Sequence, residues 1–129
     1  MADTGIEFAN VAVVVSRAYA KSYREPVLRF LKAYVEGTKR FLSDRGLGVK
    51  ALRKYTGIQD QEILAKTYDL FADKYIKKNP SLSLKGVEQA LMMIADRNPK
   101  AKNRKAEEFV DLSFMNELEK SGFLKSVWP

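Results

Sequence analysis

The side chains that could perform acid–base or nucleophilic chemistry are carboxylates and lysines, because the 129 residues include no cysteine and no histidine. Their absence excludes disulfides, zinc sites of the usual ligand types and nucleophiles activated by histidine. The carboxylates and lysines show no spacing that singles out a pair. We therefore expect no catalytic residue, no metal site, no cofactor and no enzymatic activity. An enzyme that uses only carboxylates and lysines is the weaker alternative.

Positive charge is the second chemical feature, since 23 Lys and Arg residues outnumber 16 Asp and Glu residues and the net charge is +7. Such a balance favours acidic partners such as nucleic acid or anionic lipid. One run could contact phosphates: Arg97, Lys100, Lys102, Arg104 and Lys105. No aromatic residue interrupts this run, so it lacks a base-stacking platform. We interpret it as an exposed loop, and nucleic-acid binding is not expected.

Three further patterns also fall short of a binding site. The acidic group Glu107, Glu108 and Asp111 lacks the alternating ligands of a calcium loop. The Gly-Leu-Gly at residues 46–48 lacks the Gly-Lys-Ser/Thr that a phosphate-binding loop requires. The six tyrosines mostly recur at helical spacing, which is typical of the edges of an amphipathic core.

The elements that would position these residues are mostly helical. A long helix is predicted from about Glu25 to about Asp44, because its apolar residues recur at steps of three and four. These residues are Val27, Leu28, Leu31, Tyr34, Val35, Thr38, Phe41 and Leu42. Gly37 costs this helix about 1 kcal/mol relative to alanine, so it either marks the close approach of another backbone or has no packing role. We expect Gly46 and Gly48 to end the helix.

A β-branched run, Val-Ala-Val-Val-Val at residues 11–15, predicts a strand that is buried on both faces, as in a parallel sheet. Thr4 and Glu7 fit a capping box, so a helix through the valines is the alternative. A single strand cannot satisfy its own backbone groups and needs a neighbour.

Capping signals place the remaining helices. A short helix is expected at Arg17–Ser22, and a helical turn at residues 106–110. The predicted N-caps and C-terminal glycines are Asp60, Ser83, Ser113, Gly57 and Gly122. The expected fold class is mainly α, with five or six helices plus one N-terminal hydrophobic strand (or helix), in a single domain that covers residues 1–129.

No membrane span is expected, because the longest apolar run, residues 11–15, is far shorter than the roughly 18 residues that a span requires. Asp3 and Glu7 stand where a secretory signal would carry basic residues followed by an apolar stretch. We therefore expect the chain to stay in the cytoplasm if it is expressed alone.

The order of several short motifs resembles one family. The valine run is followed by Ser-Arg-Ala-Tyr at residues 16–19, Val-Leu-Arg-Phe-Leu-Lys-Ala-Tyr-Val-Glu-Gly at 27–37, Leu-Arg-Lys-Tyr-Thr at 52–56, Tyr-Asp-Leu-Phe at 68–71, Pro-Ser-Leu at 80–82, Phe-Val-Asp-Leu-Ser-Phe at 109–114 and Glu-Leu-Glu-Lys-Ser-Gly-Phe at 117–123. Together they resemble the C-terminal part of a periplasmic solute-binding protein of ABC transporters, of the nitrate/sulfonate/taurine type, a group that includes the thiamine-precursor binding proteins.

The resemblance implies a type II periplasmic binding fold, in which two α/β lobes hold the solute in a cleft. This chain would supply part of one lobe: one strand and the helices that complete it. It would be a non-enzymatic part of the binding component of an importer for a sulfonate, nitrate or pyrimidine-like solute, located in the periplasm or cell envelope. Phe8 and Asn10 correspond to the cleft edge and are the implied ligand-binding residues. Related eukaryotic pyrimidine synthases use a histidine and a cysteine-rich motif, which this chain lacks.

Two expectations about partners follow. A small-molecule solute would bind well only in the full-length context, and the chain alone would form a homo-oligomer through residues 11–15 and the long helix. The alternative function is a stand-alone basic helical interaction module that binds nucleic acid or an acidic protein. Salt dependence discriminates between the two functions, because binding to phosphates weakens steeply as salt rises.

Overall fold

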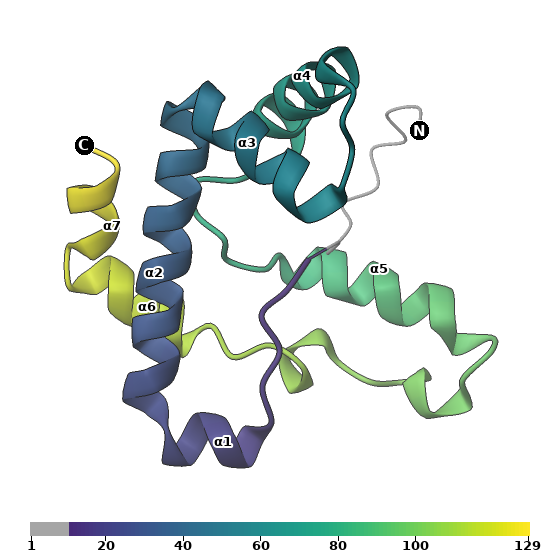
Figure 1. Ribbon diagram of the computed structural model, residues 1–129. Helices are drawn as coiled ribbons and strands as arrows, with labels where there is room; N and C mark the ends of the chain where they lie inside the picture. The colour runs from purple at the N-terminus through teal and green to yellow at the C-terminus, as the bar shows by residue number, and fades with distance from the viewer. Residues whose placement is uncertain (1–10) are drawn as a thin grey trace. The chain divides into compact units, whose positions relative to one another are not determined.

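The structure is a computed structural model that describes residues 11–129 (Figure 1). It confirms the mainly helical fold class. Of the described residues, one compact unit, unit 1, contains residues 11–24 and 81–117, and unit 2 contains residues 25–80 and 118–129. The expected single domain and the relation to a binding-protein lobe stay predictions. The elements are α1 (Arg17–Ser22), α2 (Arg24–Ser43), α3 (Arg45–Thr56), α4 (Gln61–Leu70), η1 (Phe71–Tyr75), α5 (Leu84–Ala95), η2 (Pro99–Ala101), η3 (Ala106–Glu108), α6 (Ser113–Lys120) and α7 (Phe123–Val127).

Residues 11–16 form neither a strand nor a helix, so the predicted strand and the helical alternative are both wrong for this segment. The first helix of the described chain begins at Arg17, where the Oγ atom of Ser16 accepts a hydrogen bond from the Tyr19 N–H at 3.1 Å. A strand fails to form because no other segment between residues 11 and 129 is a strand that could pair with it. The helix is disfavoured because β-branched residues lose side-chain freedom there. Thr4 and Glu7 lie outside the described residues.

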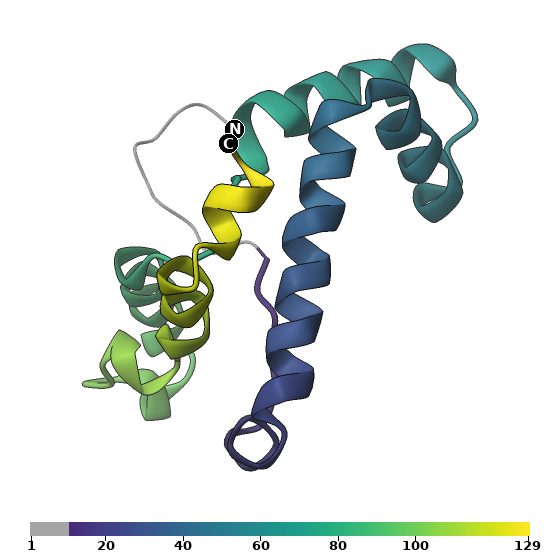
Figure 2. The same cartoon turned by 90° about the vertical axis from the view of Figure 1, so that its left-hand side faces the viewer.

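Helix α2 organises unit 2. It has nearly the predicted bounds, and the centre of its predicted apolar face is buried: Val27, Leu28, Leu31 and Val35. Helix α7 lies beside α2 in both views (Figures 1 and 2), and the Nζ atom of Lys32 is 5.8 Å from the centre of the Phe123 ring. Leu118 and Val127 are also buried in this unit. Burial of the apolar face, rather than helix propensity, therefore holds α2 in place.

Gly46 and Gly48 lie inside helix α3, so the prediction that they end the long helix is wrong. The long helix ends because Asp44 starts the next helix: its side chain accepts a hydrogen bond from the Leu47 N–H at 2.9 Å. An N-cap of this kind satisfies a backbone donor that the helix itself cannot pair. Helix α3, which starts at this cap, ends at Gly57 as predicted, where φ is 74°.

The two other glycines of interest have opposite surroundings. A Cβ atom at Gly48 would lie 2.7 Å from Cδ2 of Tyr68 and 3.2 Å from the carbonyl oxygen of Phe41. Tyr68 cannot easily retreat, because it is buried and its hydroxyl donates to that same Phe41 carbonyl at 2.8 Å. A Cβ atom at Gly37 would have no atom within 4 Å. The close approach of another segment, which was one of the two interpretations of Gly37, therefore occurs at Gly48 instead.

Helix α4 begins as predicted, since Asp60 accepts hydrogen bonds from the N–H groups of Glu62 (2.9 Å) and Ile63 (3.0 Å). The wider helical turn of η1 extends it, and Ile76 donates to the Phe71 carbonyl at 2.9 Å. Leu64 is fully buried. The cap and the buried face together hold α4 against α3 (Figure 2).

In unit 1, helix α5 begins as predicted, because Ser83 Oγ accepts a hydrogen bond from the Gly86 N–H at 3.3 Å. The chain after α5 turns back and packs against it through η2 and η3 (Figure 1). Ala101 and Ala106 are the buried residues of these two short turns. The predicted helical turn after residue 105 is therefore present, as η3.

Gly48 and Gly37 together test the packing of Tyr68 against α3. Gly48→Ala should lower the free energy of unfolding by roughly 1–3 kcal/mol, the usual effect of overpacking, although alanine is the better helix former. Gly37→Ala is the matched control in α2, and it should raise the free energy of unfolding by up to about 1 kcal/mol because its site is open. Urea unfolding followed by circular dichroism measures both. Equal effects of the two substitutions would contradict the assigned packing.

Candidate functional site

The two ligand-binding residues predicted from the sequence, Phe8 and Asn10, lie outside the described residues. Their role stays a prediction.

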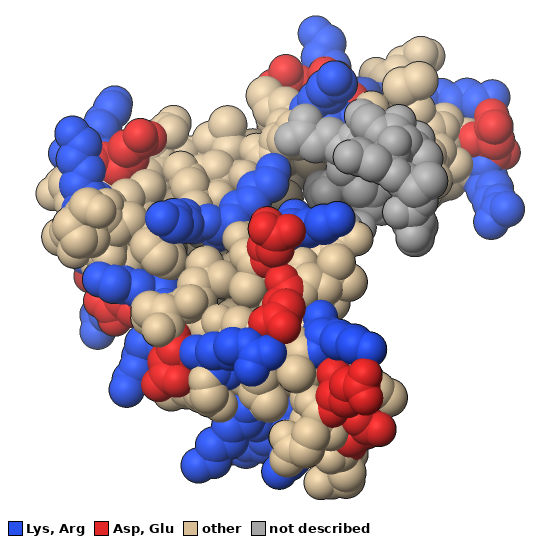
Figure 3. Space-filling model, turned by 90° about the horizontal axis from the view of Figure 1, so that it is seen from above, with Lys and Arg blue, Asp and Glu red and all other residues tan. Residues whose placement is uncertain are grey.

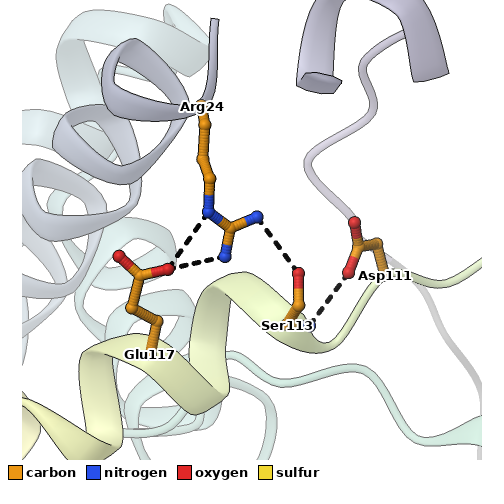
Figure 4. Close-up of polar contacts among 4 residues, drawn as sticks. All are labelled: Arg24, Asp111, Ser113 and Glu117. Atoms are coloured by element: carbon orange, nitrogen blue, oxygen red, sulfur yellow. Dashed lines mark hydrogen bonds and ion pairs between the residues drawn. The ribbon is translucent and has the colours of Figure 1, made fainter. Parts of the chain in front are cut away.

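The most connected polar cluster joins the start of α2 to the start of α6, within unit 1 (Figure 4). The Arg24 guanidinium donates to Glu117 Oε2 from Nε at 3.1 Å and from Nη2 at 2.6 Å. Its Nη1 donates to Ser113 Oγ at 3.3 Å. The same guanidinium lies 4.3 Å from the centre of the buried Phe114 ring. Arg24 therefore contacts three side chains of α6, although its own side chain stays partly exposed.

Asp111 completes this cluster. Its Oδ1 atom accepts a hydrogen bond from the Ser113 N–H at 2.9 Å. Hydrogen bonds from Ser113 lower the pKa of the Asp111 carboxyl, and the positive charge of Arg24 lowers that pKa further. Ser113 was predicted to be the N-cap, but it is the first residue of α6. The Asp111 side chain, two residues earlier, pairs with the Ser113 N–H, which the helix itself leaves without a partner.

A similar pair occurs in unit 2, where Arg45 binds both carboxylate oxygens of Asp69 at 2.9 Å. The hydrogen bond from Arg45 is the main cause of a lowered pKa of Asp69. Arg45 also lies 5.8 Å from the centre of the Tyr68 ring. In both clusters the charged groups are paired with each other, so neither offers a free acid or base for catalysis.

No group of three or more acidic, histidine or cysteine side chains that could hold a metal ion occurs among residues 11–129. None of the helices in the described part of the chain is long and apolar enough to cross a bilayer.

Helix α2 has a second apolar face that is uncovered, and Tyr34, which was predicted to share the buried face, belongs to it. Phe30, Ala33, Tyr34 and Gly37 follow one another at steps that place them on one side of a helix. All four are exposed, and Phe30 is 55% exposed. The sequence carries a signal for this face. Around the helix axis, the polar residues fill one sector, and they separate the second apolar face from the buried face on one side. A helix that is apolar over this much of its circumference is typical of a helix covered on two sides.

The valine segment is a second uncovered surface, in unit 1. Val11, Val13, Val14 and Val15 are all exposed, and Val14 is 85% exposed. The segment has no regular secondary structure, so its backbone groups have no ladder partner in the described chain. Consecutive exposed β-branched residues with free backbone groups are a template for strand pairing.

Charged side chains are distributed more evenly over the surface than the exposed apolar side chains are. Figure 3 shows basic and acidic side chains interspersed on the face that it displays. The basic run at residues 97–105 is the exception, because all five of its basic side chains are exposed and no acidic residue interrupts it. The expected exposed loop is confirmed, although η2 gives it a short helical turn.

Comparison with known proteins identifies no relative: no protein-family model matches the chain, and no curated protein or solved structure matches it.

The Asp111 cap generates a prediction about acid stability. A carboxyl whose pKa is lower in the folded protein stabilises the fold above its unfolded pKa of about 3.9, and this stabilisation is lost as the pH falls through the folded pKa. Asp111→Asn keeps an oxygen acceptor but removes the charge, so its stability should fall less steeply than that of the wild type below about pH 4. Asp111→Ala should lose about 1 kcal/mol at pH 7.

Denaturant unfolding of the three proteins between pH 2 and pH 7 measures this difference. Asp73→Asn is a control in unit 2, because Asp73 is exposed and belongs to no cluster described above. If Asp111→Asn and the wild type lost stability in parallel below pH 4, the carboxylate would not have the assigned role.

Proposed function

We propose that this chain is a non-enzymatic part of the substrate-binding component of an ABC importer, equivalent to part of one lobe of a two-lobed solute-binding protein. The solute class is a small sulfonate, nitrate or pyrimidine-like compound, and the compartment is the periplasm or cell envelope. The order of motifs between residues 16 and 123 supports this proposal. The observation that carries it is the valine segment, a run of strand-forming residues without a sheet.

The second apolar face of α2 supports the same proposal. In a lobe of this type, helices flank a sheet, and a helix that packs on both sides needs apolar residues in two sectors. Phe30 and Tyr34 are exposed here, and the open site at Gly37 leaves room for a neighbouring backbone. The missing neighbours would also supply most of the cleft, so the chain alone would bind its solute poorly.

Calorimetric titration of the chain with taurine, nitrate and a hydroxymethylpyrimidine should show no saturable binding. The chain should then be mixed with a solute-binding protein of the nitrate/sulfonate/taurine type that lacks the segment matching residues 11–129. We expect a one-to-one complex and a gain of solute binding, because the valine segment can pair inside the partner's sheet.

Val13→Asp combined with Val15→Asp should abolish that complex, because both charges would be buried in a sheet. Lys50→Asp, an exposed residue of α3, is the control and should leave the complex intact. Tight solute binding by the chain alone, or a complex that tolerates the two valine substitutions, would contradict the proposal.

We also propose that, without such a partner, the chain forms a homo-oligomer through the valine segment and the second face of α2. Two copies of residues 11–15 can satisfy each other's backbone groups by strand pairing. Two copies of α2 can bring Phe30 and Tyr34 of one helix over Ala33 and Gly37 of the other. Such large-to-small packing makes a surface complementary to itself.

Sedimentation velocity over a concentration series measures this association. The weight-average sedimentation coefficient should rise with concentration, and Phe30→Glu with Tyr34→Glu should abolish the rise. Lys39→Glu with Arg40→Glu, on the polar side of α2, is the matched control. A strict monomer at every concentration would rule out the homo-oligomer and leave the importer proposal to its own test.

A further inference from the structure

The last turn of α5 and the basic run form one continuous feature of unit 1. Met92, Met93 and Ile94 are consecutive and exposed, with exposed fractions of 74% for Met92 and 63% for Met93. Ala95 and Asp96 come next, and residues 97–105 then contain five basic side chains and no acidic one. Figure 1 shows this segment leaving the end of α5 and turning back along it. Exposed apolar side chains therefore adjoin a cluster of positive charge. We name residues 92–105 the α5 tip.

The backbone of the α5 tip is fixed by its own hydrogen bonds. Asn98 Oδ1 accepts from the Lys100 N–H at 3.2 Å, and Lys102 N–H donates to the Pro99 carbonyl at 3.1 Å. Ala101 is buried between two exposed lysines. The segment thus turns its small residue inward and its basic residues outward. A preorganised surface of this kind loses less conformational entropy on binding than a loose loop does.

Most of the positive charge at the α5 tip is unpaired. Arg104 forms an ion pair with Glu108 at 2.9 Å. The other four basic residues form no ion pair with any residue that the structure describes: Arg97, Lys100, Lys102 and Lys105. Two acids are close in sequence, Asp96 within the tip and Glu107 just after it. Both are exposed, and neither pairs with these four within residues 11–129. Free cations beside exposed apolar residues match an anionic surface with an apolar interior.

We propose that the α5 tip docks on an anionic lipid surface. The basic side chains would lie among the lipid phosphates, where each one near the surface changes partitioning by about fivefold. The methionines and Ile94 would enter the boundary between headgroups and acyl chains, as apolar residues of interfacial helices do. Nucleic acid offers no such apolar region to these side chains, and the basic run has no interleaved aromatic residue for base stacking. This inference is independent of the importer proposal.

Co-sedimentation of the full chain with vesicles tests the proposal. Vesicles of phosphatidylcholine with one quarter phosphatidylglycerol should bind the protein at 50 mM salt, whereas pure phosphatidylcholine vesicles should not. Replacing Arg97, Lys100, Lys102 and Lys105 by Gln should weaken the binding at least tenfold. Met92→Gln with Met93→Gln should weaken it severalfold and should also weaken the part of the binding that persists at 500 mM salt.

Matched controls separate this site from general charge and general hydrophobicity. Replacing Lys39, Arg40, Lys50 and Lys54 by Gln removes the same charge from unit 2, and Tyr55→Gln removes an exposed apolar side chain from α3. Both control proteins should bind like the wild type. Equal losses in a control and in the corresponding tip variant would overturn the proposal.

A duplex DNA is titrated as a soluble polyanion in a second arm. Binding to DNA that is as tight as binding to the vesicles, and that is insensitive to the two methionine substitutions, would also overturn the lipid assignment. Circular dichroism of each variant confirms that it is folded as the wild type.

Discussion

The burial of one face of α2 is the constraint on which unit 2 depends. A helix of this length is stable in water mainly because its apolar face is covered. Val35, at the centre of that face, is completely inaccessible. Tyr68 of α4 contacts both α3 and the end of α2. The ring of Tyr68 lies over Gly48, and its hydroxyl donates to the Phe41 carbonyl at 2.8 Å. The absence of a side chain at Gly48 is thus a requirement of the packing.

The same helix shows what the chain leaves uncovered. Its second apolar face, around Phe30 and Tyr34, has no partner among the described residues, and the valine segment has no sheet. Both features follow one physical rule, because apolar surface and backbone hydrogen-bonding groups are each stabilised only by a partner. Both surfaces are therefore the places where we propose that further polypeptide binds. The importer proposal and the homo-oligomer proposal differ in the identity of that polypeptide and agree on the surfaces.

Charged residues have two distinct roles in this chain. Arg24 and Arg45 form contacts within the fold, since each binds a carboxylate and lies beside an aromatic ring. Surface pairs of this type contribute little net stability, but they fix the direction of the helices that they join. Among the basic residues of the α5 tip, only Arg104 has such partners between residues 11 and 129, since it pairs with Glu108 and lies 5.9 Å from the centre of the Phe109 ring. The charge of the other basic residues of the tip is therefore available to a partner outside the chain.

Much of the helical layout could be predicted from the sequence alone, because caps and helical periodicity act within four residues along the chain. Asp60, Ser83, Gly57 and Gly122 mark helix ends as expected, and the buried face of α2 was read correctly at its centre. The bounds of α2 were nearly correct, but the residues that end α2 and cap the start of α6 were assigned wrongly. The side chains of Asp44 and Asp111 accept the hydrogen bonds there, in place of the glycine and serine signals beside them. The ligand-binding role of Phe8 and Asn10 rests on the resemblance alone.

The sequence by itself determined where helices form, which side of each is apolar, and that the chain carries excess positive charge without histidine or cysteine chemistry. Only the tertiary structure decided which apolar face of α2 is covered, which glycine is packed and which basic residues are unpaired. It also decided that the valine segment stays without regular structure. The reason is that caps and periodicity are local, whereas burial, strand pairing and ion pairing require a second segment at a particular place in space.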